Sequence, residues 1–208
     1  MMRGKDLGER IYKMMKLDLM LGKYDNHEMY NEQDFADRYG CSRTPAREAA
    51  GRLVLEGFLN KYPSKGYIIR IPSETEVREL RECRYILECS VIDKIVADAS
   101  DDQIHGLERV NTEDVMDVLY TNNLSFHLDM VRLTGNTKLE QMVESLLYLL
   151  VRPLVATRYP SYEDYASRTQ GGGRGLTKEH MAIVEALLAR DAAKAKELLK
   201  EDVYPAKY

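Results

Sequence analysis

The sequence has few cysteines, no long apolar run and no strong excess of one charge, and each shortage excludes a class of protein. Three cysteines in 208 residues are too few for a disulfide framework, and none forms a Cys-x-x-Cys pair, so we expect reduced thiols. No stretch reaches the roughly 18–20 consecutive apolar residues that a membrane-spanning helix needs. No apolar run follows the first basic residues, as it would in a secretory signal. We therefore expect a cytoplasmic protein with no membrane partner.

The composition is that of a folded globular chain, with 44% hydrophobic and 31% charged residues. Residues 1–72 carry 13 Lys and Arg against 10 Asp and Glu, a net charge of +3. Residues 73–208 carry 17 against 24, a net charge of −7, within a total of −4. This division suggests that only the first part of the chain meets a polyanion.

The hydrophobic pattern also changes near residue 72. Helical and strand signals are mixed before it. Apolar residues at helical spacing follow in runs at 74–99, 101–118, 119–134, 137–158, 176–189 and 191–204. We therefore predict a mainly α protein with one domain at 1–72 and an all-helical antiparallel bundle at 73–208.

The first domain has the element order of a winged helix-turn-helix. Helices are expected at 4–21 and 31–40, the second between Asn31 as N-cap and the C-terminal Gly40. After a tight turn, Thr44 followed by proline predicts the N-cap of a third helix.

Two strand-like runs at 58–62 and 67–70 follow, joined by a turn that carries Lys65 and Gly66. This hairpin would be the wing, which places a cationic tip near phosphate or the minor groove while a helix enters the major groove.

Arg43, Thr44 and Arg47 lie at the N-terminal end of the predicted third helix. Unpaired N–H groups at such an end favour phosphate, and an arginine can bind O6 and N7 of guanine, which discriminates by about 1–3 kcal/mol. The alternative is that these are solvated arginines and that Thr44 is only a cap. The helix order and the wing favour DNA binding.

The sequence GCSRTPAREA at 40–49, with EGF at 56–58 and PSKGY at 63–67, resembles the GntR family of bacterial transcriptional regulators over about residues 8–72. The family usually has a Pro-Gly turn where this chain has KYDN at 23–26, a difference in a loop and not in the recognition helix. The resemblance implies operator contacts from Gln33, Ser42, Arg43, Thr44, Arg47, Lys65 and Gly66.

The predicted bundle carries four polar residues on otherwise apolar helix faces: Asn123, His127, His180 and Asp202. Burying such groups without partners costs about 1–3 kcal/mol or more each, so something should satisfy them. Two imidazoles, a carboxylate and an amide oxygen would suit a divalent metal such as Zn²⁺ or Ni²⁺. The alternative is that each is a hydrogen-bonded core residue, and both stay open at this point.

The sequence NLSFH at 123–127, followed by TGN at 134–136, is similar to the DxxFH…GN signature of the FCD subclass, the GntR regulators with an all-helical ligand-binding domain. The resemblance implies a site with four metal ligands, of which this chain keeps His127 and His180. It has Asn123 for the usual aspartate and Asp202 for the usual histidine. A metal-binding site and a metal-free site both remain compatible with this set.

Arg84 is a further polar residue on an apolar helix face, with Glu88 four residues later. An internal ion pair between them is one explanation. The FCD resemblance implies instead that Arg84 binds the carboxylate of a small organic-acid effector. Arg152 and Tyr148 are weaker candidates for the same effector. His27 and His105 match no pattern and are expected at the surface.

We therefore predict a ligand-responsive transcriptional regulator, a repressor like most of the family, that binds a palindromic operator as a homodimer. Two alternatives are a regulator that senses the metal itself and a metal-dependent enzyme fused to a DNA-binding domain. The enzyme is disfavoured because no nucleophile or general base accompanies the four polar residues.

Overall fold

A computed structural model describes the chain at residues 4–108, 122–158 and 177–204. Its contacts divide the chain into two units, one of residues 1–73 with 151–170 and the other of residues 74–150 with 171–208. The expected helices at 101–118 and 119–134 are described only in part, because residues 109–121 lie outside these ranges. In the described part of the chain, no helix is both long and apolar enough to cross a membrane.

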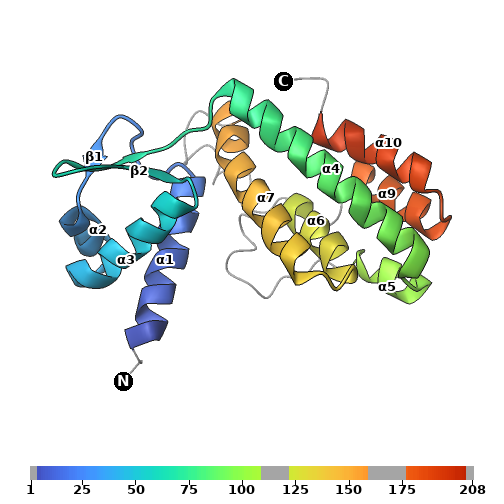
Figure 1. Cartoon of the computed structure of the whole chain (residues 1–208), viewed down its shortest axis with the longest axis horizontal. Coiled ribbons are helices and arrows are strands. Elements are labelled where there is room, and N and C mark those ends of the chain that lie inside the picture. Colours follow the sequence, from blue (N-terminus) through green and yellow to red (C-terminus); the bar gives the residue numbers. More distant parts are fainter. Residues whose placement is uncertain (1–3, 109–121, 159–176, 205–208) are drawn as a thin grey trace. The chain divides into compact units, whose positions relative to one another are not determined.

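The described residues up to 73 form three helices and a small antiparallel sheet in the first unit (Figure 1). Strand β3 lies between β1 and β2, and Lys61 is paired with Tyr67 in the β2–β3 hairpin. The hairpin confirms the predicted wing, whereas β1 was not predicted. The elements are α1 (Gly4–Met20), β1 (Met29–Tyr30), α2 (Glu32–Tyr39), α3 (Arg43–Leu55), β2 (Leu59–Tyr62) and β3 (Gly66–Ile69).

The ends of α2 follow the sequence prediction. The side chain of Asn31 accepts hydrogen bonds from the backbone N–H groups of Gln33 and Asp34, and the Asp34 carboxylate accepts one from the backbone of Asn31. This is a capping box. Gly40 ends the helix with φ 61°, in the left-handed region that glycine adopts most easily.

The predicted cap of α3 was wrong by two residues. The helix begins at Arg43, so Thr44 already lies inside it, and the N-cap residue is Ser42 with extended backbone angles of −80° and 164°. The proline is tolerated at the third helical position because the N–H groups of the first turn have no partner within the helix. The shift leaves Arg43, Thr44 and Arg47 in the first two turns of the helix.

The loop that departs from the family pattern packs onto α2. Tyr24 is 5% exposed, and its ring meets those of Tyr30 and Phe35 edge to face. The hydroxyl oxygens of Tyr24 and Tyr39 lie 2.6 Å apart, and Tyr39 donates a hydrogen bond to Asp18. Burial raises the pKa of Tyr24 to about 12. The loop at 23–26 is therefore held by contacts of Tyr24 with α2 and, through Tyr39, with α1.

The second unit is helical throughout its described residues, as predicted. Its core is formed by apolar side chains of α4, α6, α7, α9 and α10, among them Val91, Val131, Leu147, Ile183 and Leu199, all at most 1% exposed. Burying each such side chain contributes about 1.5–3 kcal/mol. The elements are α4 (Glu74–Asp98), α5 (Asp101–Gly106), α6 (Asn122–Leu133), α7 (Thr137–Arg158), α9 (Lys178–Leu188) and α10 (Ala192–Val203). The division between the units falls within α7, after residue 150.

Candidate functional site

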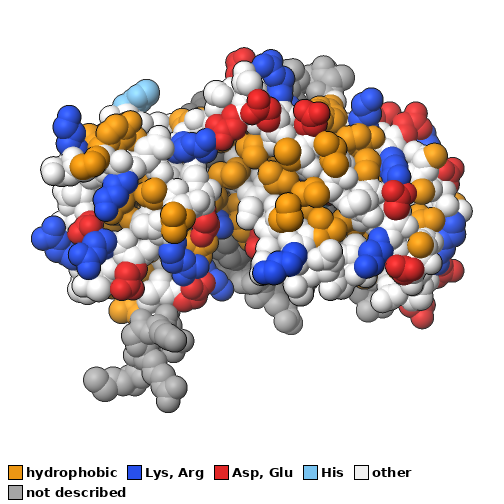
Figure 2. Space-filling model, in the orientation of Figure 1, with side chains coloured by type: hydrophobic (Ala, Val, Ile, Leu, Met, Phe, Trp, Pro, Cys, Tyr) orange, Lys and Arg blue, Asp and Glu red, His pale blue; other side chains and the backbone are white. Residues whose placement is uncertain are grey.

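The N-terminal end of α3 presents cationic side chains to solvent. Arg43, Thr44 and Arg47 are exposed, while the opposite face of the helix buries Ala46, Ala49, Ala50 and Leu53. Neither guanidinium forms a hydrogen bond or an ion pair with the residues that the structure describes. Figure 2 shows Lys and Arg side chains projecting from the surface around α2 and α3. These groups are free to bind an anion.

The other predicted contact residues with exposed side chains also belong to the first unit. Ser42 is exposed, as is Gln33, whose side-chain amide donates a hydrogen bond to Asp37 at 2.7 Å. Lys65 is exposed in the turn of the β2–β3 hairpin.

Gly66 has a structural reason to be glycine. Its φ of 117° lies in a region that other residues rarely adopt, and a Cβ there would collide with the backbone carbonyl oxygen of Tyr30. This close approach occurs where β1 is paired with β3, next to the pair Tyr30 and Tyr67. The glycine is therefore required by the sheet, whatever it contacts outside the protein.

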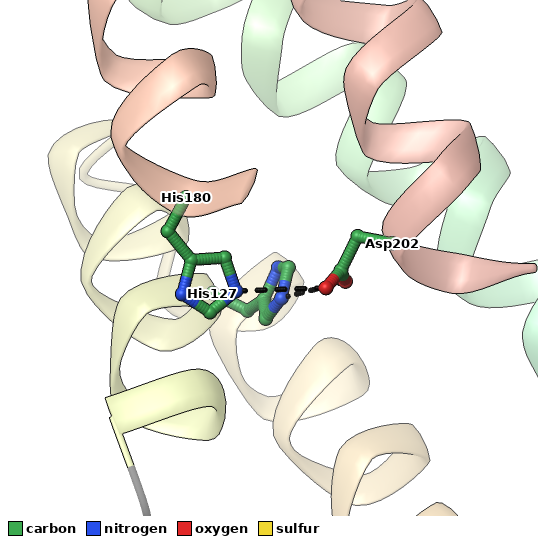
Figure 3. A group of neighbouring side chains, drawn as sticks. All are labelled: His127, His180 and Asp202. Carbon is green, nitrogen blue, oxygen red and sulfur yellow. Dashed lines mark ion pairs between the residues drawn. The ribbon is translucent and has the colours of Figure 1, made fainter. Parts of the chain in front are cut away.

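In the second unit, charged and polar side chains from four helices converge on one buried centre. Arg84 and Glu88 come from α4, His127 from α6, His180 from α9 and Asp202 from α10. Figure 3 shows the side chains of His127, His180 and Asp202 pointing toward one another. Glu88 and both histidines are 0% exposed, and Arg84 is 9% exposed. The structure therefore brings together three of the four predicted metal ligands and the predicted effector arginine.

Arg84 is the hub of this centre. Its Nε donates to Glu88 Oε1 at 2.8 Å, and its Nη2 lies 2.8 Å from Asp202 Oδ2 and 2.6 Å from His127 Nε2. Burial raises the pKa of a carboxyl. The charge of Arg84 and the hydrogen bonds from Arg84 and His127 nevertheless hold the pKa of Glu88 below its usual value. The neighbouring side chains of His127, His180 and Arg84 hold the pKa of Asp202 well below its usual range, although burial alone would raise it. Both carboxyls are therefore ionised. The ion pair with Glu88 that the sequence left open exists, and Asp202 shares the same guanidinium.

His127 is held from both sides. Its Nδ1 lies 2.7 Å from Glu88 Oε2, and its Nε2 also approaches Asp202 Oδ2 at 3.1 Å. Burial and the charge of Arg84 lower the pKa of His127, whereas the nearby carboxylates of Glu88 and Asp202 raise it. A proton on Nε2 would face the Arg84 Nη2 donor, so the 2.6 Å contact exists only while Nε2 carries a lone pair.

His180 lacks the partners that a buried imidazole needs. Neither of its ring nitrogens has a hydrogen-bond partner among the described residues, and Nε2 lies 3.6 Å from Asp202 Oδ1. Its ring stacks on Phe126 with centroids 4.3 Å apart. Burial lowers the pKa of His180, which keeps the imidazole neutral. A neutral, buried and unpaired imidazole is a suitable ligand for a metal.

The donor set fits a divalent cation if Arg84 Nη2 moves away from the ligand atoms. His127, His180 and Asp202 each offer a ligand atom within 4.8 Å of the others, and two imidazoles with a carboxylate suit Zn²⁺ or Ni²⁺. With neutral imidazoles, one guanidinium and two carboxylates leave the centre with a net charge of about −1, which favours a cation. However, Arg84 Nη2 already holds two of these ligand atoms.

The remaining predicted residues are placed as follows. The side chains of Asn123 and Arg152 lie outside the described part of the structure. Tyr148 is buried on α7, and its hydroxyl donates to Glu144 at 2.8 Å. His27 and His105 are exposed, as expected.

Comparison with known proteins finds two matching families, one for each end of the chain. The FCD domain matches residues 79–203, and the family described as bacterial regulatory proteins, gntR family, matches residues 7–69. The chain is 32% identical over 169 residues to the Nta operon transcriptional regulator of Aminobacter aminovorans, covering 78% of this chain and 75% of that protein.

It is 26% identical over 204 residues to the HTH-type transcriptional repressor GlaR of Escherichia coli K12, covering 91% of this chain and 89% of that protein. The solved structure of E. coli McbR/YncC shares the fold, with a TM-score of 0.69, 19% identity, and 98% and 94% of the two chains covered.

Proposed function

The chain belongs to the GntR family of bacterial transcriptional regulators and carries an FCD domain, and from this premise we propose that it represses transcription in response to a small organic acid. The matched relatives are transcriptional regulators, so the chain is a regulator and the alternative of an enzyme is excluded. The operator, the effector, the metal and the dimer are the proposed parts of this function. We place this regulation in the cytoplasm, where bacterial DNA lies.

The observation that carries the DNA-binding role is the exposed and unpaired pair Arg43 and Arg47 at the start of α3. We assign base contacts to these arginines and phosphate contacts to Ser42, Thr44 and Lys65, with Gln33 in support. Sequence is read by base-edge contacts, whereas phosphate contacts fix the register of the protein on the duplex.

Arg47→Ala tests this assignment in a mobility-shift assay with duplexes from the promoter that the regulator controls. Loss of a bidentate contact to guanine should weaken binding by about 1–3 kcal/mol, or about 5- to 150-fold, and relax specificity at one position. Arg78→Ala removes an exposed guanidinium on α4 and should leave the affinity unchanged. Equal affinities of wild type and Arg47→Ala at moderate salt would refute the groove assignment.

The buried centre of the second unit supports the effector role. Arg84 is a guanidinium in a water-poor site, where a carboxylate can form a forked ion pair, and His180 offers an unpaired nitrogen. Zn²⁺ or Ni²⁺ on His127, His180 and Asp202, with Asn123 as a fourth ligand, would supply a Lewis-acidic point for a second oxygen of the acid. Tyr148 and Arg152 remain candidates for the rest of the effector.

The same mobility-shift assay tests this role when carboxylic acids are titrated with and without metal. An effector can change operator affinity only by its different affinity for two arrangements of the protein. A response to acid identifies an organic-acid sensor, and a response to metal alone identifies a metal sensor. No response to either would refute the effector role.

The proposed homodimer has a candidate surface on the second unit. Ile86 on α4 is 60% exposed and Met142 on α7 is 57% exposed. Figure 2 shows hydrophobic side chains gathered over α4 and α7. Exposed apolar patches of this kind mark interaction sites, and two copies of the chain would match two operator half-sites.

A further inference from the structure

The contact between Arg84 Nη2 and His127 Nε2 sets a limit on what else the buried centre can hold. An imidazole nitrogen has one lone pair, and the Nδ1 of His127 is engaged by Glu88 at 2.7 Å. Nε2 is therefore the only atom that His127 can offer to a metal, and at 2.6 Å it is already the partner of Arg84. Guanidinium and metal require the same electron pair.

Asp202 adds a second point of competition. Its Oδ2 lies 2.8 Å from Arg84 Nη2, while its Oδ1 faces His180 at 3.6 Å. The cation-binding atoms of His127 and Asp202 thus converge on the nitrogen of the guanidinium. A cation and Arg84 Nη2 cannot both lie between them, because they would repel each other at close range in a buried site.

We infer that Arg84 and a divalent cation exclude one another at this centre, so that cation binding releases Arg84 Nη2 for the carboxylate of an effector. Arg84 Nε keeps its bond to Glu88 Oε1, at 2.8 Å, so the guanidinium can turn about this point without leaving the centre. The exclusion rests on the contacts alone, whereas the use of the released guanidinium rests on the proposed effector role. In the absence of metal, Arg84 is the internal cation of the site.

The first test compares Ni²⁺ binding to the full chain by isothermal titration calorimetry. Arg84→Met keeps the length of the side chain and removes its N–H donors. A charge-assisted hydrogen bond no longer has to be broken, so Ni²⁺ should bind about tenfold more tightly or better. Arg78→Met removes a guanidinium from the exposed side of α4 and should leave Ni²⁺ affinity unchanged. Ni²⁺ binding to Arg84→Met but not to wild type also supports exclusion. Equal or weaker binding by Arg84→Met, or binding by neither protein, overturns it.

The second test separates exclusion from simple charge repulsion. Crystals of the wild-type chain are compared with and without Ni²⁺, and the ion is located by anomalous scattering. An ion on His127 Nε2 with Arg84 Nη2 withdrawn supports the inference, whereas an ion bound there with the arginine contact intact overturns it. This test also stands if Arg84→Met fails to fold.

Operator binding by the wild-type chain without metal keeps the two hypotheses apart. Intact operator binding together with coexisting Ni²⁺ and Arg84 contacts would overturn only the exclusion. Failure of the wild type to bind its promoter duplex would overturn only the proposed function.

Discussion

Replacing Gly66 by alanine should separate the wing hairpin from β1. The loss of stability can be worked out from the backbone conformation and contacts of Gly66. A residue other than glycine at φ 117° costs about 1–3 kcal/mol in strain. The added Cβ also collides with the Tyr30 carbonyl oxygen, which is backbone and cannot rotate away. Separating β1 from β3 then weakens the pairing of Tyr30 with Tyr67, at about 0.5–1.5 kcal/mol per hydrogen bond. We expect a loss of about 2–5 kcal/mol, a large share of a typical stability of 5–15 kcal/mol.

Gly51→Ala is the matched control, because Gly51 lies inside α3 and a Cβ there meets nothing within 4 Å. Alanine should stabilise this helical position by about 0.5–1 kcal/mol. Thermal unfolding gives the change in stability, and hydrogen exchange of residues 29–30 and 66–69 shows where protection is lost. The reasoning fails if Gly66→Ala retains wild-type protection in both segments and melts with the wild type.

Two other substitutions test the wing tip and the buried centre. Lys65→Ala should reduce the slope of log affinity against log salt by about 1, because one phosphate contact is lost; an unaltered slope would place Lys65 away from phosphate. Glu88→Ala removes one partner of a buried charge pair and should cost about 3–5 kcal/mol in urea unfolding, whereas Glu185→Ala on the exposed side of α9 should stay within about 0.5 kcal/mol. A stability of Glu88→Ala close to that of the wild type would contradict the assigned charge network.

Local signals in the sequence were sufficient for most of the fold. Helix α2 begins after the N-cap Asn31 and ends at the left-handed Gly40, as predicted. Each of these signals depends only on nearby residues in the chain. Strand β1 could not be predicted because two residues, Met29 and Tyr30, carry no periodicity, and they are a strand only through pairing with β3. The start of α3 was missed because both Ser42 and Thr44 are good cap residues, and the Ser42 side chain makes no capping hydrogen bond that would distinguish it.

The sequence predicted which residues meet in the buried centre, but it did not predict all of the hydrogen bonds between them. Polar residues on apolar helix faces correctly indicated that His127, His180 and Asp202 meet, because a buried polar group needs a partner. The contact of Glu88 with His127 joins residues 39 positions apart, and no local pattern indicates it. A partial signal was available: Glu88 lies four residues after Arg84 and four before Ile92, on the buried line of α4.

The position of the Asp202 carboxylate explains why it forms an ion pair with Arg84. The FCD resemblance implies an aspartate at 123 and a histidine at 202, whereas this chain has asparagine and aspartate at these positions. A histidine at 202 would offer Arg84 a single lone pair without formal charge. Asp202 offers a charged oxygen at 2.8 Å, and such charge-assisted bonds are about twice as strong as neutral ones. Moving the carboxylate from α6 to α10 therefore joins α10 to α4 through Arg84, across 118 positions of the chain. A ligand that takes either Arg84 or Asp202 acts directly on this link between helices, which gives the centre a physical route from binding to a change in helix packing.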